Sequence, residues 1–143
     1  MDRTDRPQGF RAVGLIGLFY LLDGIAFGVL AGSAASQQMR VAWRLAAWVT
    51  SAIVFALHIG YERLRLRNPP LVAALHTSLA AALGAFGLAV AANVHALIAP
   101  SGSSRTLFLV ALLAWPVITA APAFVAAFAA AFLLGPRRPS EEP

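Results

Sequence analysis

Residues 15–32, with the sequence LIGLFYLLDGIAFGVLAG, are the stretch that decides the predicted fold. They belong to an apolar run from residue 12 to residue 31 that only Asp23 interrupts. A helix of this length rises about 30 Å, which is the thickness of a bilayer core. The run therefore predicts a membrane-spanning helix. A cleaved signal peptide is the rival interpretation, because arginines precede the run, but the run is longer than a usual signal core and contains an acid.

The composition of the whole chain favours lipid as its surroundings. Of 143 residues, 59% are hydrophobic and 12% are charged, and the mean hydropathy is +0.74. Soluble domains carry roughly 25% charged residues, so this chain lacks the polar surface that water requires. The net charge of +5 comes from arginines that flank the apolar runs, which indicates membrane topology rather than nucleic-acid binding. The absence of cysteine excludes disulfides, thiolate nucleophiles and cysteine-based metal sites.

Three further apolar runs predict helices, so that residues 12–134 form one all-α domain, an integral membrane four-helix bundle. The last two predicted helices would each be about 43 Å long, and we expect them to tilt or to extend beyond the membrane. Pro116 and Pro122 predict a kink in the last helix. The four predicted helices lie at about 12–31, 41–61, 71–99 and 106–134.

Both termini are predicted to lie in the cytoplasm. Eight arginines belong to the N-terminal tail (1–11), the 62–70 loop and the C-terminal tail (135–143), against three at the opposite ends of the helices. Arginine is enriched on the cytoplasmic side of membrane proteins, so the chain is predicted to be a multi-pass protein of the cell (inner) membrane. Pro7 and Gly9 further predict that the N-terminal tail is irregular.

Small residues at regular spacing predict faces on which helices pack closely. The first helix has a GxxxG pattern, the third has two glycines among alanines, and the fourth has an alanine row beside three phenylalanines. These faces would dock onto other helices of the bundle or onto another membrane protein. The predicted packing residues are Gly24, Gly28, Gly32, Gly84, Gly87, Ala91, Ala123, Ala127 and Ala131.

The ends of the second helix carry residues typical of the membrane interface. Arg44 lies between Trp43 and Trp48 at its start, and Tyr61 lies at its far end. An arginine side chain can extend its charged group toward water, while indole and phenol rings settle at headgroup level. These four residues are predicted to anchor the helix.

Asp23 is the one acid near the middle of a predicted span, where a carboxyl group is energetically costly. The simpler interpretation is a protonated, hydrogen-bonded Asp23 that fixes helix register, with Ser51 or Thr50 of the second helix as the donor. The alternative is a proton-linked or cation-linked site. The sequence leaves both open.

His58 and His76 flank the arginine-rich loop and are predicted to lie at similar shallow depth near the cytoplasmic face. Two such histidines could hold a b-type haem between them. In the simpler interpretation His58 pairs with Glu62, four residues later on the same helix face, and His76 makes a polar contact at the interface. No metal site and no resident cofactor are predicted.

The chain contains no hydrolytic or phosphate-binding motif and no paired carboxylates, so no catalytic residue is predicted. The first functional hypothesis is therefore a non-enzymatic subunit, assembly partner or scaffold that acts through helix packing. Its expected partners are the lipid bilayer and either a second copy of the chain or another membrane protein. A haem-binding membrane anchor that uses His58 and His76 is a further hypothesis.

The layout of four helices in a short chain, with an acid in the first, is similar to that of the small multidrug-resistance transporters. An aspartate, Asp23, stands where that family has a glutamate. The resemblance implies a small oligomeric proton-coupled transporter in which Asp23 would carry the proton.

Overall fold

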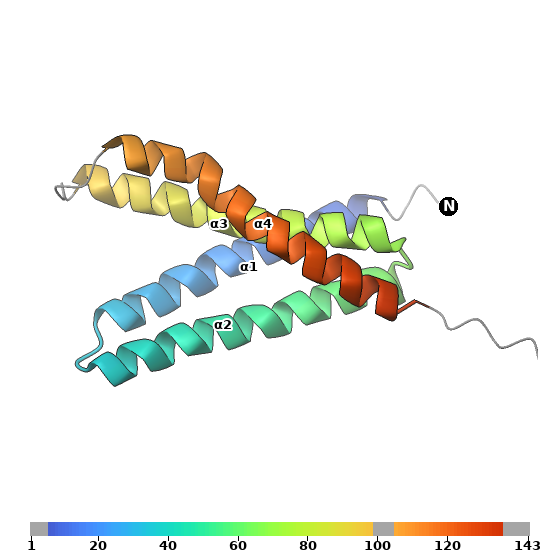
Figure 1. Ribbon diagram of the computed structural model, residues 1–143, viewed down its shortest axis with the longest axis horizontal. Coiled ribbons are helices and arrows are strands. Elements are labelled where there is room, and N and C mark those ends of the chain that lie inside the picture. The colour runs from blue at the N-terminus through green and yellow to red at the C-terminus, as the bar shows by residue number, and fades with distance from the viewer. Residues whose placement is uncertain (1–5, 99–104, 136–143) are drawn as a thin grey trace, which may run out of the picture.

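The computed structural model describes residues 6–98 and 105–135, and 92% of these residues are helical (Figure 1). No strand occurs in the described part of the chain, so the predicted all-α class is confirmed. The elements are α1 (Arg6–Gly32), α2 (Gln37–Gly60), the short π-helical turn η1 (Tyr61–Arg65), α3 (Pro70–Ile98) and α4 (Arg105–Leu133).

The first helix begins earlier than the sequence predicts. Helix α1 includes residues 6–11, for which the sequence predicts an irregular tail. Proline is tolerated in the first turn of a helix because its missing N–H would have no helical partner there, so Pro7 does not prevent this start. Helix α2 also starts early, and Ser36 caps it by accepting a hydrogen bond from the Met39 N–H at 3.2 Å. The predicted turn at 100–104 and most of the C-terminal tail lie outside the described residues.

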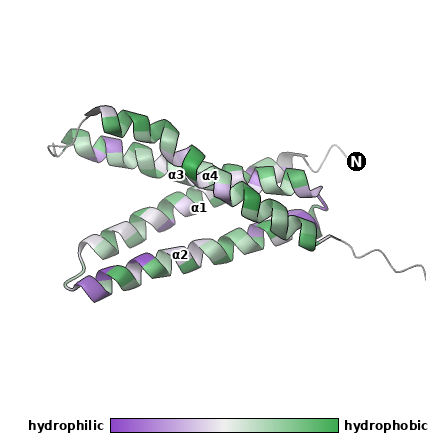
Figure 2. Ribbon diagram, viewed as in Figure 1, coloured by the Kyte–Doolittle hydropathy of each residue, from purple (hydrophilic) through white to green (hydrophobic). Residues whose placement is uncertain are grey.

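All four helices are long and apolar enough to cross a membrane. Figure 2 shows hydrophobic residues along most of their length, with hydrophilic residues gathered at the start of α2 and around η1. Polar groups at the ends of long apolar helices are the pattern of a multi-pass membrane protein. Helix α4 is continuous through Pro116 and Pro122, and its ribbon changes direction part-way along (Figure 1).

Helices α1 and α3 cross where glycine allows their backbones to approach. A Cβ added to Gly84 would overlap Tyr20 Cβ, and one added to Gly17 would lie 2.9 Å from Leu83 Cβ. Neither neighbour can move easily, because both atoms are attached directly to a helix backbone. The predicted packing role of Gly84 fits this crossing, whereas the role of Gly17 was not predicted.

Of the predicted GxxxG face of α1, only the first glycine packs against another helix. Gly24 faces the Leu88 side chain of α3, but a Cβ added to Gly28 or Gly32 would have no atom of a neighbouring element within 4 Å. Toward the turn between α1 and α2, the α1–α2 and α3–α4 hairpins diverge (Figure 1). Within this chain, therefore, Gly28 and Gly32 do not pack against another helix.

The small-residue face of α4 packs at the other end of the bundle. Ala127 and Ala131 are fully buried there, while Phe128 and Phe132 on the bulky side are exposed. Two residues of the predicted alanine row thus lie in the core, whereas Ala123 is only half-buried and Phe124 packs against the core as well. On α3, Gly87 meets Leu21 of α1 and Ala91 is half-buried. The core cluster consists of Ile59, Ala73, Ala74, Ala127 and Ala131.

We expect Gly84→Ala to destabilise the protein, because the new methyl group would overlap Tyr20 at the α1–α3 crossing. The expected loss is about 1–3 kcal/mol, as for other overpacked helix contacts. Gly14→Ala is the matched control, since a Cβ at Gly14 meets nothing within 4 Å. Thermal unfolding in mild detergent measures both. Equal stability of the two variants would contradict the crossing.

Candidate functional site

The most densely connected polar group in the described chain lies where α2, η1 and α3 meet. We call His58, Glu62, Asn68 and His76 the Glu62 cluster. Glu62 has none of its surface exposed, and His58 has 1% exposed. A buried carboxyl group needs hydrogen-bond partners to offset the loss of water. The surroundings of Glu62 supply them.

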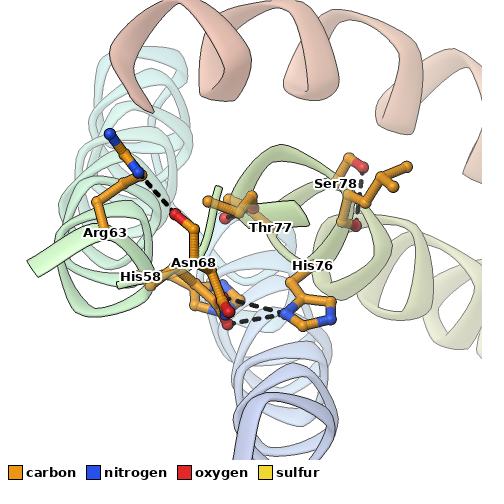
Figure 3. A network of polar contacts seen from close by, with 9 residues as sticks. His58, Arg63, Asn68, His76, Thr77 and Ser78 are labelled. Atoms are coloured by element: carbon orange, nitrogen blue, oxygen red, sulfur yellow. Dashed lines mark hydrogen bonds and ion pairs between the residues drawn. The ribbon is translucent and has the colours of Figure 1, made fainter. Parts of the chain in front are cut away.

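The partners of Glu62 come from three segments of the chain. Asn68 Nδ2 donates a hydrogen bond to Glu62 Oε2 at 2.5 Å, and His76 Nδ1 lies 3.1 Å from both carboxylate oxygens. His58 Nε2 lies 3.6 Å from Glu62 Oε1. Figure 3 shows His58, Asn68 and His76 pointing toward one another. The sequence predicts that His58 pairs with Glu62 and that His76 makes a polar contact. In the structure both histidines lie against the same carboxylate, that of Glu62.

Local backbone structure explains why these side chains converge. His58 and Glu62 are four residues apart, so they lie on one helix face. The η1 turn then widens the helix, with the Leu66 N–H donating to the Tyr61 carbonyl at 3.0 Å. Arg67 adopts a left-handed conformation with φ of 52°, and this reverses the chain. Asn68 is thereby brought back over Glu62, where its N–H also donates to the Glu62 carbonyl at 2.9 Å.

Arg63 connects this corner to the end of α4. Its Nε donates to the Ala131 carbonyl at 2.7 Å, and its Nη1 donates to the Asn68 carbonyl at 2.6 Å. The last carbonyls of a helix have no helical donors and carry partial negative charge, so a guanidinium group is a favourable partner for them. The sequence suggested only a topological role for Arg63. Nothing in the spacing of the residues indicates which carbonyl it would reach.

The first turns of α1 cover the same corner. A Cβ at Gly9 would lie 2.8 Å from His76 Cε1, and the Phe10 ring centre is 5.4 Å from that of His76. Gly9 is therefore needed for close contact with the imidazole. Because the sequence predicts an irregular tail here, no feature of it indicates that α1 packs against His76.

Glu62, Asn68 and His76 form hydrogen bonds that hold η1, the following loop and α3 together. His58 is the exception, because neither of its ring nitrogens has a hydrogen-bond partner in the described part of the chain. Among the described residues, no group of three or more His, Cys, Asp or Glu side chains is arranged to hold a metal ion. Haem binding by His58 and His76 stays a prediction, and in this arrangement Glu62 contacts both histidines.

Asp23 forms a second, separate contact in the middle of the bundle. Its side chain is 8% exposed, and its Oδ2 accepts a hydrogen bond from Ser51 Oγ of α2 at 3.0 Å. Ser51 is one of the two donors predicted from the sequence. The other, Thr50, instead donates to the Ala46 carbonyl of its own helix at 2.9 Å. The contact joins α1 to α2, and the protonation state of Asp23 stays a prediction.

The predicted interface anchors lie on the outside of the bundle, with one exception. Arg44, Trp48 and Tyr61 are exposed. Trp43 is half-buried, with its ring centre 6.1 Å from that of Phe27 on α1. Trp43 thus contributes to the α1–α2 contact as well as to the helix end.

Comparisons with known protein families, with curated proteins and with solved structures find no match to this chain.

We expect Glu62→Ala to destabilise this corner of the bundle, since Asn68 and His76 would lose their shared acceptor. Leaving buried donors unpaired costs about 1–3 kcal/mol. Glu62→Gln should cost less, because it keeps the size of the side chain and one acceptor oxygen. Arg65→Gln is the control, as Arg65 is exposed on the same turn. Thermal unfolding in detergent ranks the three, and an Ala variant as stable as the control would contradict a structural role for Glu62.

Proposed function

We propose that the chain is a non-enzymatic multi-pass membrane component that associates with another transmembrane helix through the first half of α4. The associated helix belongs to a second copy of the chain or to another membrane protein. Both termini face the cytoplasm. The observation that carries the proposal is the exposure of α4, a long apolar helix whose first half has no fully buried side chain among its described residues.

The exposure of α4 supports this role. Ala127 is the first buried residue among its described side chains, so the helix from Thr106 to Ala126 contributes no fully buried side chain to the bundle. Asn93 Nδ2 of α3 donates to the Phe108 carbonyl at 2.9 Å and holds the α3–α4 hairpin together. The α1–α2 hairpin diverges from it at this end (Figure 1). The side of this half of α4 that is turned away from α3 is consequently available to a neighbour.

The two prolines of α4 give that neighbour something to bind. Proline lacks an N–H, so Pro116 and Pro122 leave the carbonyls of Leu112 and Ile118 without their usual helical donors. In hydrocarbon such carbonyls must find donors on other side chains or helices. Ile118 is 63% exposed, which leaves its side of the helix open to a partner. A helix that presents a hydroxyl or amide group would satisfy these carbonyls.

The polar groups that could have indicated catalysis have partners inside the chain. Glu62 is bound by Asn68 and His76, Asp23 by Ser51, and Arg63 by two backbone carbonyls. For Glu62 and Arg63 these contacts favour a structural role. The cytoplasmic orientation is supported by the arginine distribution together with the contacts Gly9–His76 and Arg63–Ala131, which bring the arginine-rich segments to one end.

Cysteine crosslinking tests the association, because the chain contains no cysteine of its own. We expect Leu113→Cys, at a position 77% exposed on α4, to form disulfide-linked or maleimide-linked adducts of defined mass in native membranes. Leu15→Cys on α1 is the control, since Leu15 is 69% exposed but belongs to a helix that buries side chains along its length, at Val13, Asp23 and Ala31. Equal crosslinking at the two positions would indicate random collision and would contradict the proposal.

A small proton-coupled transporter is the second candidate, and the buried carboxyl group of Asp23 favours it. This carboxyl lies near the middle of a candidate span, and its partner there, Ser51, is neutral. Acids within membrane spans commonly mark proton pathways.

For this second candidate we expect cells that express the protein to accumulate less of a cationic dye than control cells. Asp23→Asn should abolish the difference, because an amide cannot exchange a proton with the substrate. The amide oxygen can still accept the Ser51 hydrogen bond, so the stability of the variant should change little. Dye accumulation that is the same with and without the wild-type protein would eliminate this candidate for such substrates.

A further inference from the structure

A hollow of about 600 Å³ lies between α1 and α2 on the side of Gly28 and Gly32. Its volume is within the range of about 300–1,000 Å³ that is typical of ligand sites. Gly28 and Gly32 line it from α1, and we call them its glycine floor, since a Cβ added to either would have no atom of a neighbouring element within 4 Å. A hydrocarbon chain on this floor could therefore lie directly against the backbone of α1.

The walls of the hollow differ in chemistry along its length. Phe27 and Trp48 supply aromatic surface, whereas Arg40 and Arg44 supply two guanidinium groups toward the start of α2. The two arginines are one helical turn apart, so they lie on the same face of α2. The hollow is thus apolar along its floor and strongly positive at one end.

No acid of the described chain neutralises that positive end. Asp23 and Glu62 are the acidic residues among residues 6–98 and 105–135. Asp23 is hydrogen-bonded to Ser51, and Glu62 contacts the other members of the Glu62 cluster. Arg40 Nη1 donates to Gln37 Oε1 at 3.4 Å, and this partner is neutral. The N-terminus of α2 adds partial positive charge, because the N–H groups of its first turn lack helical acceptors. No acidic residue in that turn offsets this charge.

We infer that this α1–α2 hollow binds an anionic phospholipid. The phosphate contacts Arg40 and Arg44, and an acyl chain lies on the glycine floor beside Phe27 and Trp48. Guanidinium groups pair well with phosphate, and basic pockets between transmembrane helices are known sites for acidic headgroups on the cytoplasmic side. With both termini in the cytoplasm, the phosphate here would belong to a lipid of the opposite leaflet. A second copy of the chain is a poorer occupant, because it would bring the same two arginines against this end. A soluble anion would leave the apolar floor without a partner.

Native mass spectrometry of the purified protein tests the site, with phosphatidylglycerol and phosphatidylcholine of identical acyl chains as probes. We expect wild-type protein to retain phosphatidylglycerol at a concentration about tenfold lower than phosphatidylcholine, since each basic residue contributes modestly to headgroup binding. The double variant Arg40→Gln/Arg44→Gln should lose this preference. Arg40→Lys/Arg44→Lys should keep most of it, and Arg65→Gln at the opposite end should keep all of it.

The floor is tested separately by Gly28→Leu, which fills the hollow without changing its charge. This variant should bind phosphatidylglycerol more weakly than Gly14→Leu, the matched control on the same helix, whose position also has no neighbour within 4 Å. Circular dichroism verifies that each variant keeps its helices, and only folded variants are compared.

Four results would overturn the inference. The first is equal retention of the two lipids by the wild-type protein, and the second is a preference that survives Arg40→Gln/Arg44→Gln. The third is competition by glycerol 3-phosphate at the same concentration as the lipid, which would indicate a soluble anion. The fourth is a protein dimer that dissociates on Gly28→Leu, which would make a second copy the occupant.

Discussion

The buried carboxylate of Glu62 is the interaction on which the closed end of the bundle depends. Its hydrogen-bond partners are Asn68 in the loop before α3 and His76 on α3, so one side chain of η1 holds three segments in register. Arg63, the next residue, extends the connection to α4 through the Ala131 carbonyl. In a chain with so few charged groups, two adjacent residues of opposite charge thus organise one whole end of the molecule. The apolar core of Ile59, Ala74 and Ala127 packs next to them.

The sequence predicted the features that depend on local spacing. Long apolar runs indicated four helices, and the four-residue interval between His58 and Glu62 indicated that they share a face. The Asp23–Ser51 hydrogen bond was also among the expected contacts, because a carboxyl group deep in an apolar helix has few available partners. These predictions needed only helix geometry and the cost of an unpaired polar group.

The contacts that the sequence did not predict depend on how one helix is rotated against another. Gly28 and Gly17 are both glycines of α1, yet only Gly17 lies at a helix crossing. Likewise, the partner of Arg63 is a backbone carbonyl, which has no sequence signature. Asn68 reaches Glu62 because Arg67 reverses the chain in a left-handed conformation that arginine rarely adopts. A single sequence carries no information on these rotations.

The divergence of the two hairpins gives the molecule a tapered outline (Figure 1). A tapered body in a bilayer occupies more area in one leaflet than in the other, and the wider part lies toward the turn between α1 and α2. The leaflet that holds the wider part of the protein must then contain fewer lipids than the other leaflet, or the membrane must bend around the protein. If lipid does not fill the space between the hairpins, a bilayer that holds this chain would bend around it, and lateral pressure in the wider leaflet would push the hairpins together about the Gly17–Gly84 crossing.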